Sequence, residues 1–301
     1  MKNSRNDKNQ QGFLSSLIGD PTPEKQAGLT YSMAAIVILF LSLVYGCIPE
    51  SAGTARVYLS FMVAPVAFLL LGALYFIYTK RSVKAFAKAQ NCHPKYYLIA
   101  VILQIGLLSL SELNTLFLEF LEKFGYEYSE PVLPSVEGAG FIGVMLVIAV
   151  LPAMMEDFFF RGIQLEGIKR FGTAGGVLLS GALFALFHQN PAQTVYQFIC
   201  GAAFALVAIK SSSFLPTALA HFINNAYILV LYKYEVTSFS TPVYAIILAT
   251  SVICLIVSLG YLLFADRQKT EKKTGKYSGF FLCASLGIAV FALSWVSALL
   301  A

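Results

Sequence analysis

The stretch MMEDFFFRG, Met154–Gly162, places two acids and an arginine inside an apolar run that extends from 139 to 171. An ionised side chain at the centre of a bilayer costs about 2.5–3.5 kcal/mol on insertion scales, so such groups are rare in membrane helices. Residues four apart share one face of a helix, so Asp157 and Arg161 can pair. Glu156 lies about 100° around the helix from Asp157 and can point elsewhere.

The composition of the whole chain indicates a membrane protein. Of its 301 residues, 57% are hydrophobic and 12% are charged, whereas a soluble domain has about 25% charged residues. A membrane-spanning helix needs about 20 apolar residues. We therefore predict an all-α, polytopic transmembrane helix bundle of about eight or nine spans, with the lipid bilayer as its surroundings. Nine stretches meet or nearly meet the length: Leu29–Ile48, Val57–Tyr78, Tyr96–Leu116, Ala139–Phe171, Ala174–Asn190, Thr194–Ile209, Phe214–Tyr232, Val243–Phe264 and Gly279–Leu300.

The charges between these stretches predict the orientation of the chain. With the amino terminus in the cytosol, nearly all Lys and Arg residues fall in cytosolic segments, and the long outer loop is acidic. Basic residues concentrate in cytosolic loops of membrane proteins, so we expect a cytosolic amino terminus in a multi-pass protein of the cell membrane. The basic residues lie in interhelical loops, which indicates no nucleic-acid partner. The acids of the outer loop are Glu119, Glu122, Glu127, Glu130 and Glu137.

We expect four regions along the chain. They are a polar cytosolic tail (1–28), amino-terminal transmembrane helices with the acidic loop (29–138), a helical core that holds the candidate site (139–232), and two carboxy-terminal transmembrane helices (233–301). The five cysteines follow no regular spacing, so we predict neither a disulfide framework nor a cysteine metal site. The sequence defines no oligomeric state.

A small set of polar residues in the apolar core forms the candidate site. Glu156 and His188 lie sixteen residues before and after Gly172, so an antiparallel hairpin would place them at the same depth. His221 and Asn225 are four apart and share a helix face. Each feature alone has a structural explanation, as a charge clamp or as interhelical hydrogen bonds. Together they predict a polar site built from three helices, with Pro152 permitting a kink near Glu156.

Three motifs in this core resemble those of the CAAX protease and bacteriocin-processing family of intramembrane proteases, which includes the type II CAAX prenyl endopeptidases. The family motifs read E-E-x-x-x-R, F-x-x-x-H and H-x-x-x-N. They correspond here to EDFFFR (156–161), FALFH (184–188) and HFINN (221–225), in the family order. One departure is Asp157, where a second glutamate is usual. The shorter side chain puts the positioning of Arg161 in question.

The resemblance implies an intramembrane endopeptidase in which a glutamate activates a water molecule. Glu156 would then be the base, His188 would orient the water or shuttle its proton, and His221 and Asn225 would bind the oxyanion. Asp157, Arg161 and Phe184 would support these four residues. The substrate would be a peptide or membrane protein, with a prenylated CAAX carboxy terminus as one type.

Several alternatives remain open at this point. We expect no metal cofactor, although Glu156, His188 and His221 could supply the three protein ligands of a catalytic zinc ion. A non-catalytic scaffold, regulator or immunity protein could use the same fold. A transporter would also bury ionisable residues, but it predicts repeated halves, and no internal repeat is apparent in the sequence.

Overall fold

The computed structural model describes residues 22–128, 132–267 and 271–300, and these segments contain helices and connecting turns but no β-strand. Residues 1–21 of the predicted tail lie outside the described residues, and 23–28 already belong to α2. All nine apolar stretches form helix, which confirms the all-α class. The helices are α2 Pro23–Gly46, α3 Thr54–Thr79, α4 Val83–Ala89, α5 Lys95–Leu107, α6 Ser111–Glu122, α7 Gly140–Val144, α8 Leu151–Asp157, α9 Leu165–Ile168, α10 Gly172–Phe187, α11 Thr194–Ser211, α12 Leu215–Lys233, α13 Thr241–Gly260 and α14 Tyr277–Leu300.

Short helical segments of other types connect several of these helices. Three are 3₁₀ turns: η1 Glu50–Ala52, η2 Leu108–Leu110 and η5 Pro191–Gln193. Three are π-helical: η3 Met145–Val150, η4 Phe158–Gln164 and η6 Tyr261–Ala265.

Seven helical segments of the described chain are long and apolar enough to cross a membrane, compared with the eight or nine spans predicted. The seven segments are 23–46, 54–79, 95–122, 140–168, 191–211, 241–265 and 277–300. The two remaining predicted spans are helices but are not among them. Helix α10 has only 16 residues, fewer than a full crossing needs, and α12 contains a histidine and two asparagines within one turn.

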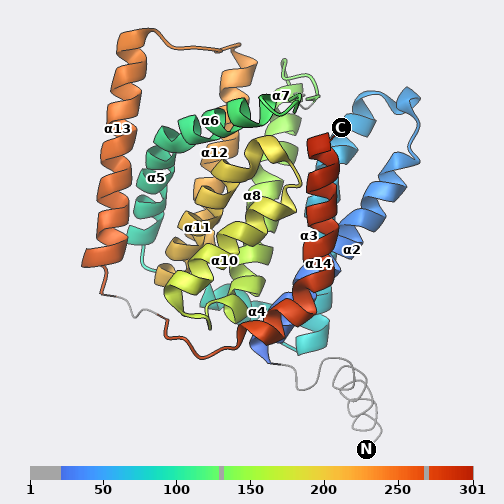
Figure 1. Cartoon of the computed structure of the whole chain (residues 1–301), viewed down its shortest axis with the longest axis vertical. Coiled ribbons are helices and arrows are strands. Elements are labelled where there is room, and N and C mark those ends of the chain that lie inside the picture. Colours follow the sequence, from blue (N-terminus) through green and yellow to red (C-terminus); the bar gives the residue numbers. More distant parts are fainter. Residues whose placement is uncertain (1–21, 129–131, 268–270, 301) are drawn as a thin grey trace, which may run out of the picture.

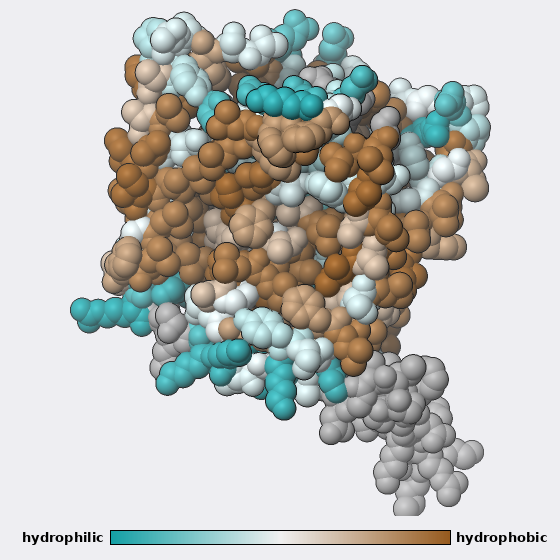
Figure 2. Space-filling model, viewed as in Figure 1, coloured by the Kyte–Doolittle hydropathy of each residue, from teal (hydrophilic) through white to brown (hydrophobic). Residues whose placement is uncertain are grey.

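The surface of the molecule has the distribution expected of an integral membrane protein. Figure 2 shows a broad hydrophobic band across the face in view, with hydrophilic residues gathered toward its two ends. Large apolar side chains are exposed on the candidate membrane spans, among them Phe40 of α2, Ile77 of α3, Ile246 of α13 and Leu293 of α14. In water such a surface would cause association, whereas in a bilayer it contacts lipid tails.

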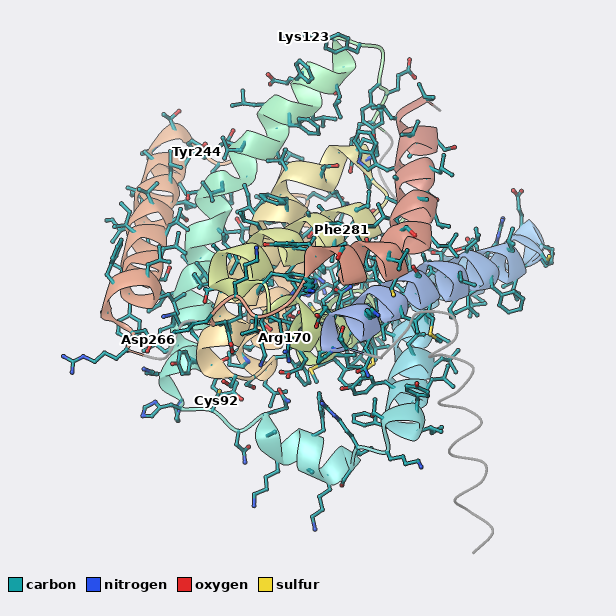
Figure 3. The ribbon with its side chains drawn as sticks, turned by 60° about the horizontal axis from the view of Figure 1, so that its bottom comes forward. Cys92, Lys123, Arg170, Tyr244, Asp266 and Phe281 are labelled. Atoms are coloured by element: carbon teal, nitrogen blue, oxygen red, sulfur yellow. The ribbon has the colours of Figure 1, made fainter. Side chains whose placement is uncertain are left out.

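The loops that were predicted to share one side of the membrane lie together in the structure. Cys92, Arg170 and Asp266 lie at the end of the bundle where α4 is found, and Lys123 and Tyr244 lie at the opposite end (Figure 3). Two of the loops at the α4 end are joined directly. The backbone N–H of Thr274 donates a hydrogen bond to the carbonyl of Arg170. The sidedness of the loops relative to one another thus agrees with the charge pattern.

The carboxy-terminal helices pack on opposite sides of the bundle (Figure 1). Helix α13 lies against α5, and α14 lies along α2. Helices α10 and α11 cross closely at Gly181, where an added Cβ atom would lie 2.7 Å from the carbonyl oxygen of Phe198. Small residues allow such close approaches between membrane helices. Helix α8, which carries Glu156 and Asp157, packs against α12 and α3.

Candidate active site

The helix that carries the acids is irregular on both sides of them. It is π-helical over η3 and η4, which flank α8, and π-helical turns are frequent at functional sites. Proline has no N–H, so Pro152 cannot donate to the carbonyl oxygen of Ile148, the fourth residue before it. The side-chain amide of Asn225 donates to that oxygen instead, at 3.3 Å. Asn225 therefore ties α12 to the irregular turn before the acids.

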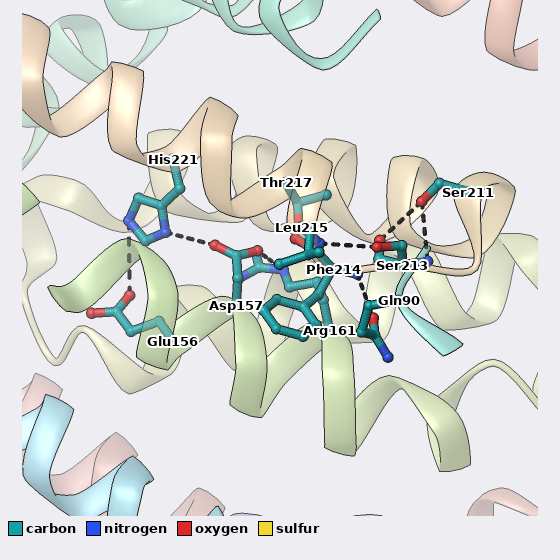
Figure 4. A network of polar contacts seen from close by, with 10 residues as sticks. All are labelled: Gln90, Glu156, Asp157, Arg161, Ser211, Ser213, Phe214, Leu215, Thr217 and His221. Carbon is teal, nitrogen blue, oxygen red and sulfur yellow. Dashed lines mark hydrogen bonds and ion pairs between the residues drawn. The ribbon is translucent and has the colours of Figure 1, made fainter. Parts of the chain in front are cut away.

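Glu156 faces His221 across the interface between α8 and α12. The Glu156 Oε2 atom lies 3.9 Å from His221 Nε2, and both side chains are buried. This separation is too long for a direct hydrogen bond. Glu156 Oε2 has no hydrogen-bond partner among the described residues. The structure thus brings together the predicted base and one of the two predicted histidines (Figure 4).

Asp157 lies between His221 and Arg161. Its pairing with Arg161 was predicted from their spacing, whereas its contact with His221 was not. Its Oδ2 atom accepts a hydrogen bond from His221 Nδ1 at 2.8 Å, and its Oδ1 atom lies 3.5 Å from Arg161 Nε. A carboxylate only accepts, so Nδ1 of His221 carries a proton and Nε2 faces Glu156. Asp157 therefore orients the imidazole as well as pairing with the arginine. The shorter side chain at 157 still reaches both partners.

Arg161 is held among aromatic rings rather than by a second acid. Its side chain is 0% exposed, and its Cζ atom lies 4.1 Å from the ring centroid of Phe184 and 5.5 Å from that of Phe204. A cation over an aromatic face is attracted by the ring quadrupole, and more strongly where water is excluded. Phe184 was predicted as a supporting residue. Phe204 belongs to no motif, and nothing in its sequence context identified it.

His188 is the residue that caps the carboxy-terminal end of α10, and its ring packs against Phe184. Its Nδ1 atom is 2.8 Å from the carbonyl oxygen of Phe184, so Nδ1 carries the proton and Nε2 is left as an acceptor. The ring centroid of Phe184 lies 4.6 Å from that of His188 and 6.0 Å from that of His221. Within the described chain, no hydrogen bond or ion pair joins His188 to Glu156. Glu156 and His188, which were predicted to act together, therefore make no direct contact. Phe184 lies between the two histidines instead.

The same side chains do not form a cluster of metal ligands. In the described parts of the chain, no three His, Cys, Asp or Glu side chains are grouped closely enough to hold one metal ion. Nδ1 of His221 is bound to Asp157 and Nδ1 of His188 to a carbonyl, which leaves Nε2 of both rings as the nitrogen available to a metal, as is usual for histidine ligands. Among the described residues, however, Glu156, His188 and His221 are not grouped as the three ligands of one ion.

These features define a class, namely a polytopic helical membrane protein with a carboxylate and imidazole site inside the bundle. The comparison with known families agrees. Residues 138–227 match the family of type II CAAX prenyl endopeptidase Rce1-like proteins, which confirms the resemblance carried by the three motifs. The match supports a CAAX protease-type intramembrane peptidase. No curated protein and no solved structure gives a significant match.

Proposed function

We propose that this protein is an intramembrane endopeptidase in which Glu156 activates the attacking water. One observation carries the proposal: the buried Oε2 atom of Glu156 has no hydrogen-bond partner among the described residues and faces the Nε2 atom of an imidazole that Asp157 orients. A buried polar atom without a partner is costly. Such an atom is suited to bind the water that hydrolysis consumes.

The separation of Glu156 and His221 suits a water molecule that contacts both. A water oxygen about 2.8 Å from each atom satisfies ordinary hydrogen-bond distances when the two atoms are 3.9 Å apart. Glu156 takes a proton from this water while the water oxygen attacks the carbonyl carbon of the peptide bond. The new C–O bond forms a tetrahedral intermediate with a negatively charged oxygen. Glu156 then returns the proton to the amide nitrogen as the C–N bond breaks.

The charged oxygen of the intermediate needs donors aimed at it. Asn225 is a candidate because an amide nitrogen has two N–H groups, of which the contact with Ile148 uses one. His221 donates from Nε2 only when both ring nitrogens carry a proton. His188 presents Nε2 as an acceptor, which is consistent with orienting the water or receiving its proton.

We propose no metal ion in this reaction, because the side chains described above do not form a three-ligand group. Purified protein treated with a strong zinc chelator is expected to keep its activity. Loss of activity that added zinc restores would replace this mechanism with a metal-dependent one.

The substrate is proposed to be a peptide or a membrane protein in the bilayer of the cell membrane. A prenylated CAAX carboxy terminus is the first substrate to test, because the matched family is described as CAAX prenyl endopeptidases.

The decisive experiment compares cells that carry the native chain with cells that carry Glu156→Gln. Membrane proteomes and released peptides are compared by mass spectrometry. Glu122→Gln is the matched control, since it is the same substitution at an exposed position of α6. We expect peptide fragments that depend on Glu156 and are unaffected in the control. Identical fragments in all three, at equal protein abundance, would refute the peptidase function.

A further inference from the structure

A second group of polar side chains, buried or partly buried, lies next to the site, one turn further along α12. Asn224 and Asn225 of α12 meet Gln104 of α5 and Tyr196 of α11, two helices that both contact α12 (Figure 1). Gln104 is 1% exposed and lies in one of the candidate membrane spans. A polar group in apolar surroundings costs free energy unless it is hydrogen-bonded, so the position of Gln104 requires a partner. Asn224 provides it.

The hydrogen bonds of this group run in one direction. Gln104 Nε2 donates to Asn224 Oδ1 at 2.9 Å, and the Tyr196 hydroxyl donates to the same oxygen at 3.1 Å. An amide oxygen has two lone pairs, so two donors use its full capacity. The nitrogen of the same amide, Nδ2, donates to Asn225 Oδ1 at 3.2 Å.

The carbonyl oxygen of Ile148 fixes the orientation of both amides. It can only accept, so the Asn225 nitrogen faces it at 3.3 Å and the Asn225 oxygen is directed to Asn224 Nδ2. The Asn224 oxygen then faces Gln104 and Tyr196, whose donors hold it in place. Without these donors the Asn224 oxygen loses both partners, and the hydrogen bond from Asn224 to Asn225 is no longer held.

We propose that Gln104 and Tyr196 are positioning residues for the peptidase reaction, which act through Asn224 to hold the Asn225 amide in place. This inference rests on the proposed function. It assigns a role to a residue of α5, which lies outside the segment 138–227 that matches the family. It also explains why a glutamine is buried in an otherwise apolar membrane helix.

The test removes each hydrogen-bond donor with a substitution that keeps the size and shape of the side chain. Gln104→Met keeps a long unbranched side chain, and Tyr196→Phe removes only the hydroxyl. A neutral hydrogen bond contributes about 0.5–1.5 kcal/mol, so we expect kcat to fall about 2- to 12-fold in each variant, with little change in KM. Tyr232→Phe is the matched control, because Tyr232 is an exposed tyrosine of α12.

The assay uses purified full-length protein in single-turnover reactions. The probe is a farnesylated CAAX peptide that carries a fluorophore and a quencher, or a peptide spanning the cleavage site that the proteome comparison identifies. Each variant is also made with Asn225→Ala. If Gln104 and Tyr196 act through Asn225, their effects on kcat disappear in that background, since coupled residues are non-additive. Unfolding temperatures in detergent show whether each variant is folded, and Gln104→Leu replaces Gln104→Met if the latter fails.

The possible outcomes separate this inference from the proposed function. Wild-type kcat in both donor variants would overturn the positioning role while cleavage that depends on Glu156 continues. A fall in kcat that persists unchanged beside Asn225→Ala would also overturn it, because the residues would then act only through helix packing. Equal activity of the native chain and Glu156→Gln would refute the proposed function. The positioning role would then be refuted as well, because it rests on that function.

Discussion

Replacing Arg161 with alanine is expected to destabilise the protein more than replacing His221 with alanine. Arg161 is fully buried, pairs with Asp157 at 3.5 Å and lies over the ring of Phe184. Its removal leaves the Asp157 carboxylate with only His221 as a charged or polar partner. Removal of His221, by contrast, leaves Asp157 paired with Arg161. The two substitutions therefore differ in whether a buried charge keeps its countercharge.

The magnitudes follow from these contacts. Breaking a buried ion pair by removing one partner costs about 3–5 kcal/mol. The hydrogen bond between His221 Nδ1 and Asp157 at 2.8 Å involves a charged group, and such bonds contribute about 1.5–3 kcal/mol. We therefore expect Arg161→Ala to lower the unfolding free energy by the larger amount. The hydrogen bond that Asp157 retains with His221 places Arg161→Ala toward the lower end of its range.

The measurement compares protein abundance in membranes and unfolding temperature in detergent. Arg161→Ala should give less protein and a lower unfolding temperature than His221→Ala. A double variant, Asp157→Asn with Arg161→Ala, should recover part of the loss, because it removes the stranded charge as well. Equal abundance and equal unfolding temperature of the two single variants would refute the argument that Arg161 neutralises Asp157.

Three further predictions concern catalysis and packing. Asp157→Asn should lower kcat by up to about 10⁴-fold, as loss of the carboxylate that orients a histidine does in Ser-His-Asp enzymes; unchanged kcat would show that Asp157 does not orient His221. Asn225→Ala should cost about 2.7–4 kcal/mol of transition-state stabilisation if it binds the oxyanion, and single-turnover rates check this against an unchanged KM. Gly181→Val should lower the unfolding temperature, since overpacking costs about 1–3 kcal/mol and Ala202 and the Phe198 carbonyl already occupy the space; a normal unfolding temperature would mean that α10 and α11 can separate there.

The helices and the candidate residues followed from local sequence features. Apolar length predicted the helical stretches, and the charge pattern correctly grouped the loops at the two ends of the bundle. The number of spans was less predictable. Helices α10 and α12 are apolar enough to be buried, but length and composition alone do not distinguish a helix surrounded by protein from one that crosses lipid.

The pairing within the site was predicted only in part. Spacing along one helix correctly placed Arg161 beside Asp157, because residues four apart share a face. The same reasoning put Glu156 and His188 at one depth, but it could not show that Phe184 lies beside both histidines. Nor could it show that Asp157 binds His221, a residue 64 positions away. Contacts between helices depend on how each helix is rotated about its axis, and sequence spacing within one helix does not contain that rotation.

The sequence by itself determined that this chain is a helical membrane protein with ionisable residues in its apolar core, because hydropathy and the energetic cost of buried charge are properties of local composition. Tertiary structure alone decided which charges meet. It placed Asp157 between an arginine and a histidine, left an oxygen of Glu156 facing that histidine, and brought Gln104 from α5 to Asn224. The physical reason is that a buried polar atom is stabilised only by a partner within about 3 Å, and such partners here come from different helices.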